Sequence, residues 1–335
     1  MKTQVKFSAI VAVGALLLAG CADSTYPSRD INVVVPFDAG GSTDLTARIL
    51  SEPMGEDLDT EVVVTNTPGA GGGVGTQSVL NAKHDGYTIL ADGMLSFAAM
   101  PVMDNLDTMP DDWDFWLATF TPNVVAVAAD SPYQTLEDLV DAMEENPGEV
   151  TFGSAGPGSA GHVGAELVAS GAGTEYEHVP YEGGNPAIVA ALAGEVDAVA
   201  QLYVEMKDML IAGDLRALAT FADEDLIIDD DLVVPSIADF LPELATSLPL
   251  GETTGLAIPK GLDEDILKSI DGAYETAMKD PDFLDFCEEQ GFTPVEVGRD
   301  GGMDYVKNLQ SVVAWTLEDA GVAVNSPADL EVPEP

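Results

Sequence analysis

The sequence predicts an α/β protein with two lobes and a ligand-binding cleft between them. Short β-branched runs alternate with helical patterns, which favours βαβ units and mainly parallel sheets flanked by helices. Two such arrays are separated by the apolar segments 123–129 and 253–259, which we interpret as crossovers between the lobes. Ligands of such sheets bind outside the carboxyl ends of the strands, so we expect the site in the interlobe cleft.

The length and apolar content permit this organisation. The chain has 335 residues and is 46% hydrophobic, enough for two cores of ordinary size. We expect residues 30–123 together with 254–324 to form the first lobe, and residues 124–253 to form the second. Residues 325–335 are expected to be an acidic tail.

The charge excludes several classes of partner. The chain has 59 acidic against 12 basic residues, a formal net charge of -47. Nucleic acid binding needs clustered Lys and Arg, so nucleic acid is not an expected partner, and anionic membrane surfaces are disfavoured for the same reason. Solubility alone is one explanation of this charge. We favour adaptation to a salty medium, because at 1 M salt the Debye length is about 3 Å.

The N-terminus predicts export and lipid anchoring. Lys2 and Lys6 precede an apolar run, residues 7–19, that is too short to span a bilayer comfortably. The following Leu18-Ala19-Gly20-Cys21 resembles a bacterial lipobox. We therefore expect residues 1–20 to be a lipoprotein signal peptide, Cys21 to carry the lipid, and residues 21–29 to be a tether. The protein would then be extracytoplasmic and attached to the membrane by that lipid.

Cysteine usage rules out a disulfide framework. Cys287 is the only other cysteine, so it has no partner if Cys21 is lipidated, and no CxxC metal site exists. Cys287 lies beside Phe283 and Phe286 in a predicted helix. We expect it to be a small buried apolar side chain rather than a reactive thiol.

The first strand and turn, residues 32–50, form a candidate anion site. Val33-Val34-Val35 reads as a buried strand that ends at Pro36, and Ala39-Gly40-Gly41 allow a tight turn. Ser42 or Thr43 can cap the helix that follows. Free N–H groups and the helix dipole at such a turn favour an anion. An ordinary βα connection that binds nothing remains the alternative.

The rest of the chain continues the alternation, with a second glycine-rich turn at residues 66–75. Asp223 to Asp231 is an acidic run, most simply a solvated loop. Further strands are expected at 61–65, 86–90, 150–154, 176–180, 197–201 and 215–220. Helices are expected at 135–146, 161–169, 186–193, 205–212, 263–279, 281–290 and 301–320.

The glycine loop after residues 150–154 has three possible functions. Residues 156–161 match G-x-G-x-x-G, but the motif alone is weak, nicotinamide cofactors are scarce outside the cell, and Pro157 stiffens the turn. A serine hydrolase would pair Ser154 or Ser159 with His162, yet neither serine has the G-x-S-x-G context. We favour a second anion site with hydroxyls from Ser154 and Ser159.

Metal and cofactor sites are not predicted. His84 and His178 have no metal-like spacing and are interpreted as structural or exposed, and His162 as capping or packing the loop. The run Asp229-Asp230-Asp231 lacks EF-hand spacing. No Gly-Lys-Ser/Thr triplet occurs, so there is no P-loop.

Several segments in order resemble the extracytoplasmic substrate-binding proteins of tripartite tricarboxylate transporters, the Bug receptors. The resemblance runs from about Tyr26 to Val324. Its segments are YPSRDINVVVPFDAGGSTD (26–44), NTPGAGGGVGT (66–76), DGYTIL (85–90), FGSAGPGSAGH (152–162), HVPYEGGNPAIVAALAGEVD (178–197) and GDLRALA (213–219).

The resemblance implies a two-lobed fold of the periplasmic-binding-protein type, type II-like, that closes on a small carboxylate. It implies membrane transporter subunits as partners, no cofactor and no catalysis. The first carboxylate site carries over to Phe37, Ala39, Gly40 and Gly41, and the second to Ser154, Gly158 and Ser159. Asp44 matches a position that the family also fills with Asp. We interpret it first as a residue that stabilises the helix start and second as a ligand contact. A ligand-presenting sensor and a secreted hydrolase are the alternatives.

Two departures from the family pattern bear on substrate choice. Residues 91–96 replace a loop often rich in Thr, Ser and Gly, and residues 200–203 replace a stretch that often reads Phe-Asp-Asn. Met94, Leu95 and Gln201 are therefore expected near the ligand. Met94 and Leu95 could favour a partly apolar carboxylate or could simply pack in the core.

Overall fold

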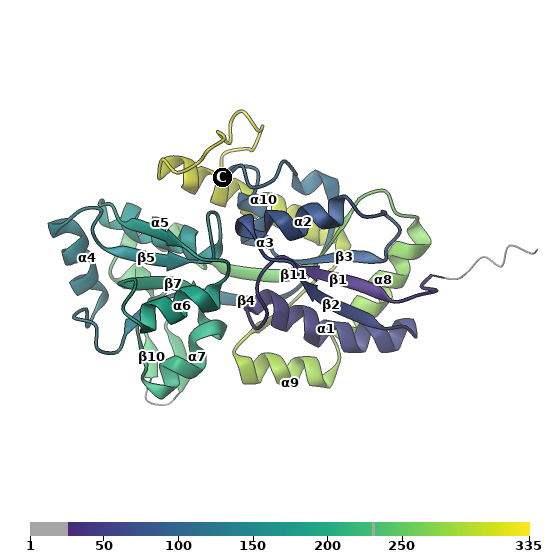
Figure 1. The fold of residues 1–335 in the computed structure, drawn as a ribbon, viewed down its shortest axis with the longest axis horizontal. Coiled ribbons are helices and arrows are strands. Elements are labelled where there is room, and N and C mark those ends of the chain that lie inside the picture. Colours follow the sequence, from purple (N-terminus) through teal and green to yellow (C-terminus); the bar gives the residue numbers. More distant parts are fainter. Residues whose placement is uncertain (1–25, 230–231) are drawn as a thin grey trace, which may run out of the picture.

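The computed structural model describes residues 26–229 and 232–335 and shows two α/β lobes joined by long strands (Figure 1). The predicted signal peptide, Cys21 and most of the tether lie outside the described residues. In the described part of the chain, no helix is both long and apolar enough to cross a membrane.

One curled sheet runs through both lobes in the order β2-β1-β3-β11-β4-β7-β5-β6, and β8 and β12 pair with β4. The outer strands pair in parallel, as predicted, but β4 and β11 pair antiparallel with their neighbours in the centre of the sheet. Parallel pairing is therefore a property of each lobe's βα units, whereas the antiparallel centre is built by the strands that connect the lobes.

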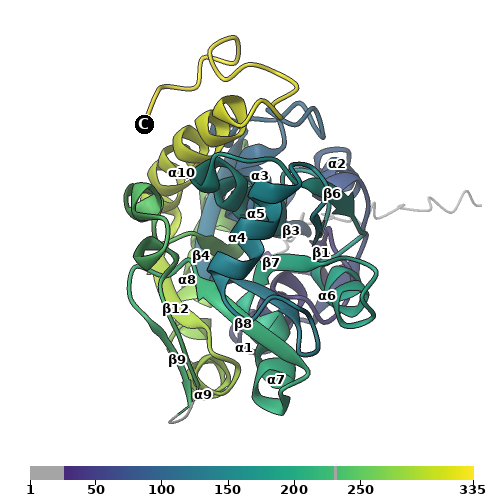
Figure 2. The same ribbon diagram turned by 90° about the vertical axis from the view of Figure 1, so that its left-hand side faces the viewer.

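The first lobe is built around β1, whose Val33, Val34 and Val35 are at most 4% exposed. Its N-terminal elements are β1 (Ile31–Val35), α1 (Ser42–Leu58), β2 (Val62–Asn66), α2 (Gly73–Leu80), β3 (Thr88–Gly93) and α3 (Met94–Ala99), with 3-10 turns at Ala70–Gly72 and Pro110–Asp112. Its C-terminal elements are α8 (Glu264–Ala277), α9 (Pro281–Gln290), β12 (Thr293–Val297) and α10 (Arg299–Asp319). Helix α10 contacts α3 and β4 and reaches α5 of the second lobe (Figure 2).

The second lobe repeats the βα pattern. Its elements are α4 (Leu136–Glu145), β5 (Thr151–Ser154), α5 (Ala160–Ala172), β6 (Glu177–Pro180), α6 (Gly184–Leu192), β7 (Ala198–Leu202), α7 (Tyr203–Ala212), β8 (Leu215–Thr220), β9 (Leu226–Asp229) and β10 (Leu232–Val234), with 3-10 turns at Ile237–Asp239 and Pro242–Ser247. The expectation of a solvated loop at 223–231 was wrong in part, because β9 pairs antiparallel with β10.

Two long strands connect the lobes. The expected strand at 123–129 is the second half of β4 (Trp113–Ala128), which pairs with β11 (Gly251–Pro259) in the first lobe and with β7 and β8 in the second. The strand begins earlier than expected, at Trp113, which is fully buried like Phe115. The predicted lobe boundaries fall within or next to these strands and remain predictions.

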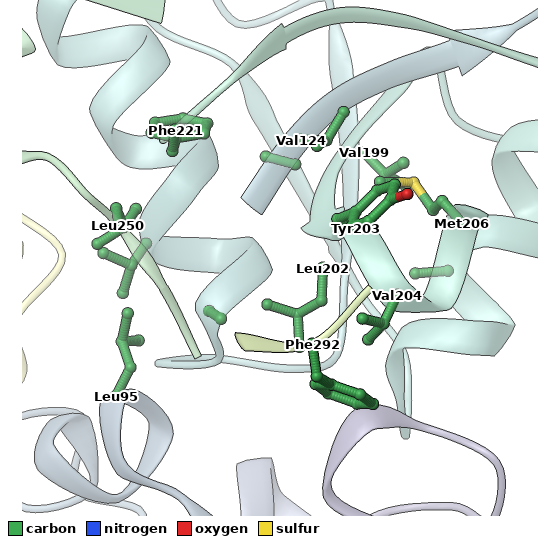
Figure 3. Packing of buried hydrophobic residues seen from close by; sticks show 14 of the residues in the cluster. Leu95, Val124, Val199, Leu202, Tyr203, Val204, Met206, Phe221, Leu250 and Phe292 are labelled. Carbon is green, nitrogen blue, oxygen red and sulfur yellow. The ribbon is translucent and has the colours of Figure 1, made fainter. Parts of the chain in front are cut away.

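The core continues across the junction of the lobes. Leu95 of α3, Leu202 of β7, Leu250 and Phe292 belong to one buried cluster (Figure 3).

Cys287 is buried in α9 as expected, and burial raises the pKa of its thiol to about 11. The C-terminal segment packs on α10, where Trp315 Nε1 donates to the Pro333 carbonyl at 2.9 Å.

Candidate functional site

A small cavity of about 40 Å³ lies between the lobes. Its lining residues come from loops and first helical turns of both lobes. The first lobe contributes Phe37, Asp38, Gly41, Ser42, Thr43, Ser96 and Glu252, and the second contributes Ala155, Ser159, Ala160, Gly183, Gly184, Asn185, Gln201, Leu202 and Glu205.

Four helices of at least nine residues present their N-terminal turns to this cavity. They are α1, α5, α6 and α7, which begin at Ser42, Ala160, Gly184 and Tyr203. The N-terminus of a helix carries partial positive charge and unpaired N–H groups. The cavity therefore offers an anion several backbone donors, although no Lys, Arg or His is among its lining residues.

The first glycine turn is held by Asp44 rather than by a capping hydroxyl. Gly41 is the N-cap residue of α1 without a side-chain hydrogen bond, so the expected capping by Ser42 or Thr43 was wrong. Asp44 Oδ2 accepts from the Gly40 N–H at 2.9 Å, and Asp44 also binds Arg48 and Asn66. Burial alone would raise the pKa of Asp44, but these hydrogen bonds hold it below its usual value. Asp44 thus stabilises the turn through its own hydrogen bonds and is not among the residues that line the cavity.

In the glycine loop before α5, the Ser159 hydroxyl, which was predicted for a bound anion, caps the helix. Ser159 is the N-cap and accepts from the His162 N–H at 3.4 Å. The Gly158 N–H donates to His162 Nδ1 at 3.0 Å, so His162 packs the loop as expected. Gly158 has φ +80° and faces the first lobe, where an added Cβ would lie 2.9 Å from Met103 Cγ.

Ser154 pairs with His178 and not with His162. The Ser154 Oγ lies 2.6 Å from His178 Nε2 and also bonds the Gly156 backbone. His178 stacks on His162 with ring centroids 4.1 Å apart. Burial, together with His162, lowers the pKa of His178 to about 3, so this ring is neutral. The serine side chain is fully buried in this network and is not part of the cavity lining.

A carboxylate from the second lobe meets the start of α1. Glu205, in the first turn of α7, accepts from the Ser42 N–H through Oε1 at 3.1 Å. Its Oε2 is buried and has no hydrogen-bond partner. Burial raises the pKa of Glu205 to about 7. Gly184 makes room for this group, because a Cβ there would lie 1.9 Å from Oε2.

A second buried carboxylate, Glu252 of β11, lines the other side of the cavity. It accepts from the Leu95 N–H at 2.7 Å and from Ser96 Oγ at 2.9 Å. Burial raises its pKa to about 7, against the effect of these hydrogen bonds and with a contribution from Glu205. Burial and the nearby Glu252 raise the pKa of Asp92 as well. Three buried acids therefore lie in or behind the cavity wall.

The lobes touch around the cavity. Asn105 Nδ2 of the first lobe donates to the Pro157 carbonyl at 2.9 Å, and Lys207 Nζ of α7 donates to the Glu289 carbonyl. Tyr203 packs on Gly291, where a Cβ would lie 2.5 Å from the ring. The two lobes are thus in direct contact beside the cavity.

The predicted ligand-binding residues fall into two groups. Phe37, Gly41, Ser159 and Gln201 line the cavity. The other seven do not: Ala39 and Gly40 are exposed, Asp44 and Gly158 support the two loops, Ser154 faces His178, and Met94 and Leu95 are fully buried core side chains. Of the two roles considered for Met94 and Leu95, their complete burial supports packing in the core. Whether the four lining residues contact a ligand remains a prediction.

The sequence analysis did not place the glycine turn before α6, or the side chains of Glu205 and Glu252, in the candidate site. Gly183-Gly184-Asn185 begins α6 at the exit of β6, the same strand-turn-helix position as the other two loops, and this repeated signal could have found it. Glu205 and Glu252 had no such signal, because each is one of 59 acidic residues.

Comparison with known proteins gives a consistent result. The family model described as "Tripartite tricarboxylate transporter family receptor" matches residues 46–314. A curated relative from Pseudomonas sp. strain P51, a UPF0065 protein in the tcbD-tcbE intergenic region, is 33% identical over 276 residues, covering 79% of each chain.

Solved structures agree with the fold. The periplasmic binding protein BugD superimposes with a TM-score of 0.81 at 26% identity, covering 89% of this chain and 99% of BugD. MatC from Rhodopseudomonas palustris, solved with bound malate, has a TM-score of 0.77 at 25% identity, covering 88% and 99%. The two-lobed architecture is therefore that of periplasmic binding proteins.

Proposed function

Because the chain belongs to the tripartite tricarboxylate transporter receptor family, we propose that it captures a small organic carboxylate between its lobes for uptake by membrane transporter subunits. It is a solute-binding receptor of that family. The ligand class and the transporter partnership are the proposed steps.

The observation that carries the ligand class is the convergence of helix N-termini from both lobes on one cavity. Helix α1 enters from the first lobe, and α5 and α6 enter from the second. A hydrogen bond from a backbone N–H to a carboxylate contributes on the order of 1.5–3 kcal/mol. Carboxylate binding by peptide dipoles suits a lining that has no basic side chain. The malate in MatC supports the same class.

Binding would proceed by closure of the lobes about β4 and β11. These two strands pass through the junction, and hinge motion at a few residues is the usual mechanism for such receptors. The first proposed carboxylate site is the turn Phe37, Ala39, Gly40 and Gly41, and the second is the loop Ser154, Gly158 and Ser159. Within these, Gly41 and Ser159 are the groups that line the cavity.

A panel of small carboxylates in a thermal-shift screen, followed by calorimetry, tests the function. We expect at least one to raise Tm by several degrees and to bind with one-to-one stoichiometry, because a ligand that binds only the folded state stabilises it. Esters and amides of the same ligand are the control and should not bind. If none of the free acids binds, carboxylate capture is ruled out.

Lipid anchoring at Cys21 and an extracytoplasmic location complete the proposal. Metabolic labelling with a radioactive fatty acid should mark the wild-type chain and not Cys21→Ser, whereas Cys287→Ser should leave labelling unchanged. A labelled Cys21→Ser chain would rule out this anchor.

Two alternatives are distinguishable. A sensor role would couple the ligand to a cellular response without uptake, so ligand uptake by cells with and without this chain separates the two. The Ser154–His178 contact is the observation that favours a hydrolase. However, this pair lies outside the cavity lining, so we expect no ester turnover. Hydrolysis that is lost in Ser154→Ala would overturn the receptor proposal.

A further inference from the structure

We propose that the ligand carries a protonated amine beside its carboxylate, so that this receptor selects small amino acids over the corresponding hydroxy acids and dicarboxylates. This rests on the proposed carboxylate-binding function and specifies its substrate class. The observation behind it is the pair of carboxylates, Glu205 and Glu252, in a cavity whose lining contains no basic side chain.

The charges lining the cavity oppose a purely anionic ligand. Glu205, Glu252 and Asp38 line it, and the buried Asp92 lies close enough to Glu252 for the two acids to interact. Salt bridges of the described residues join none of these four acids to a base. A second ligand carboxylate would add a like charge to this group, and unpaired buried charges are strongly unfavourable.

Two polar atoms in the cavity wall lack partners, and their chemistry is complementary. Glu205 Oε2 is a buried acceptor without a donor, and Nε2 of Gln201 is a buried donor without an acceptor. The Gln201 residue is only 2% exposed. Both atoms lie beside Gly184, at 1.9 and 2.9 Å from the position of an added Cβ. Buried polar groups in native proteins are nearly always hydrogen-bonded, so each calls for a ligand atom.

An α-amino acid supplies both missing partners on adjacent atoms. Its ammonium donates to Glu205 Oε2, and its carboxylate accepts from Gln201 Nε2 and from the backbone N–H groups of the surrounding helix N-termini. A hydroxy acid has only a neutral donor at that position, and a simple dicarboxylate has none.

A metal ion does not satisfy the same groups. In the described part of the chain, no set of three or more His, Cys, Asp or Glu side chains is arranged to hold one. An organic cation, which needs hydrogen bonds and a negative environment rather than a coordination shell, fits two separated carboxylates.

Calorimetry with matched ligand pairs at about pH 8 tests the inference. The pairs are L-alanine with L-lactate, L-aspartate with L-malate, and L-glutamate with L-2-hydroxyglutarate. In each pair, only the amine is replaced by a hydroxyl. We expect an amino acid to bind at least tenfold more tightly than its partner. A hydroxy acid that binds equally or better would overturn the amine proposal and leave carboxylate capture intact. If no member of any pair and no other carboxylate binds, both the amine proposal and carboxylate capture are overturned.

Glu205→Gln separates charge recognition from packing. It keeps the shape and removes the charge, so the amino acid should lose at least tenfold in affinity while the hydroxy acid keeps or gains affinity. Glu182→Gln, which removes an exposed charge outside the lining, should change neither ligand. If Glu205→Gln weakens both members of a pair equally, Glu205 acts only in holding α1 and the inference fails. Circular dichroism and Tm confirm that each variant is folded.

Discussion

At the scale of single residues, the site depends on the absence of side chains at the helix starts. An added Cβ on Gly41 would lie 3.0 Å from Glu205 Oε1, and one on Gly93 would lie 2.2 Å from the Glu252 carboxyl carbon. Real Cβ contacts are rarely this short, so neighbouring groups would have to move. These glycines therefore provide space for the buried carboxylates as well as for a ligand.

The first prediction concerns Gly41. Gly41→Val should weaken carboxylate binding at least tenfold, because the new methyl groups block the turn and displace Glu205. Calorimetry measures the change. Gly272→Val is the matched control, since nothing lies within 4 Å of its added Cβ, and it should retain wild-type affinity. Unchanged affinity in a folded Gly41→Val protein would contradict the first proposed anion site.

The second prediction concerns the charge of Glu205. Burial raises its pKa from 4.5 to about 7, so the unfolded chain releases this proton at lower pH than the folded chain does. The contribution of Glu205 to the free energy of unfolding is therefore most favourable below about pH 4.5 and is lost as pH rises through 7. The free energy of unfolding of Glu205→Gln should thus exceed that of wild type by at most about 3 kcal/mol at pH 8 and by little at pH 4.5.

Thermal unfolding of wild type and Glu205→Gln across this pH range measures the effect. The difference in Tm should grow between pH 5 and 8. Glu182→Gln, an exposed position, should show a flat difference. A constant difference for Glu205→Gln would mean that its carboxyl group does not titrate abnormally.

At the scale of elements, the strand-turn-helix unit from β1 to α1 is stabilised from within. Asp44 is 3% exposed and binds the Gly40 N–H, Arg48 and Asn66. It links the glycine turn to α1 and to the end of β2. The turn is therefore fixed by the protein itself, which would lower the entropy cost of the proposed carboxylate binding.

The third prediction follows from this network. Asp44→Asn should destabilise the protein by about 2–4 kcal/mol, because an amide presents donors to partners that are also donors. The folded pKa of Asp44 is lowered, so its contribution is complete above about pH 4 and is lost as pH falls further. Urea unfolding at pH 7 and pH 3 should show a larger loss at pH 7.

The control for this variant is Glu52→Gln on the exposed face of the same helix. It should change the free energy of unfolding by less than about 0.5 kcal/mol at either pH. An Asp44→Asn protein as stable as this control would show that the turn does not depend on Asp44.

At the scale of the whole molecule, the net charge of -47 predicts that salt affects the stability of the fold. Most described ion pairs involve at least one well-exposed side chain and contribute little each. We therefore expect repulsion among the surface carboxylates to be relieved mainly by salt, as the proposed adaptation to a salty medium requires.

The fourth prediction is a strong salt dependence at neutral pH. Raising NaCl from about 0.1 to 2 M should raise Tm by on the order of 10 °C, because screening weakens the repulsion. At about pH 4, near the pI of about 4.1, the carboxylates are largely neutralised and the same salt series should have little effect. Equal stability in dilute and concentrated salt at pH 7 would contradict the proposed adaptation.

Local sequence patterns account for the strand, turn and helix units and, through their order, for the two-lobed arrangement. The valines of β1, the glycines before α1 and α5, and the Ser159 cap encode strand, turn and helix within a few residues, because backbone preference and hydrophobic pattern act locally. Their order along the chain was enough to indicate two α/β lobes, and the resemblance to the Bug receptors added the periplasmic-binding-protein type. Local signals and the resemblance both pointed to Gly41 and Ser159, whereas Phe37 came from the resemblance and Gln201 from a departure from the family pattern.

The side chains that meet in the cavity are set by the packing of segments that are distant in the sequence. Glu205 bonds the N–H of Ser42 from 163 residues away, and Glu252 bonds Ser96 from 156 residues away. Ser154 turns from the cavity toward His178, although its backbone position is where the motif places it. Side-chain direction and contacts between distant segments depend on how the two lobes pack, and no local pattern encodes them. The size and charge of the cavity, and hence the amine that we propose for its ligand, are properties of that packing.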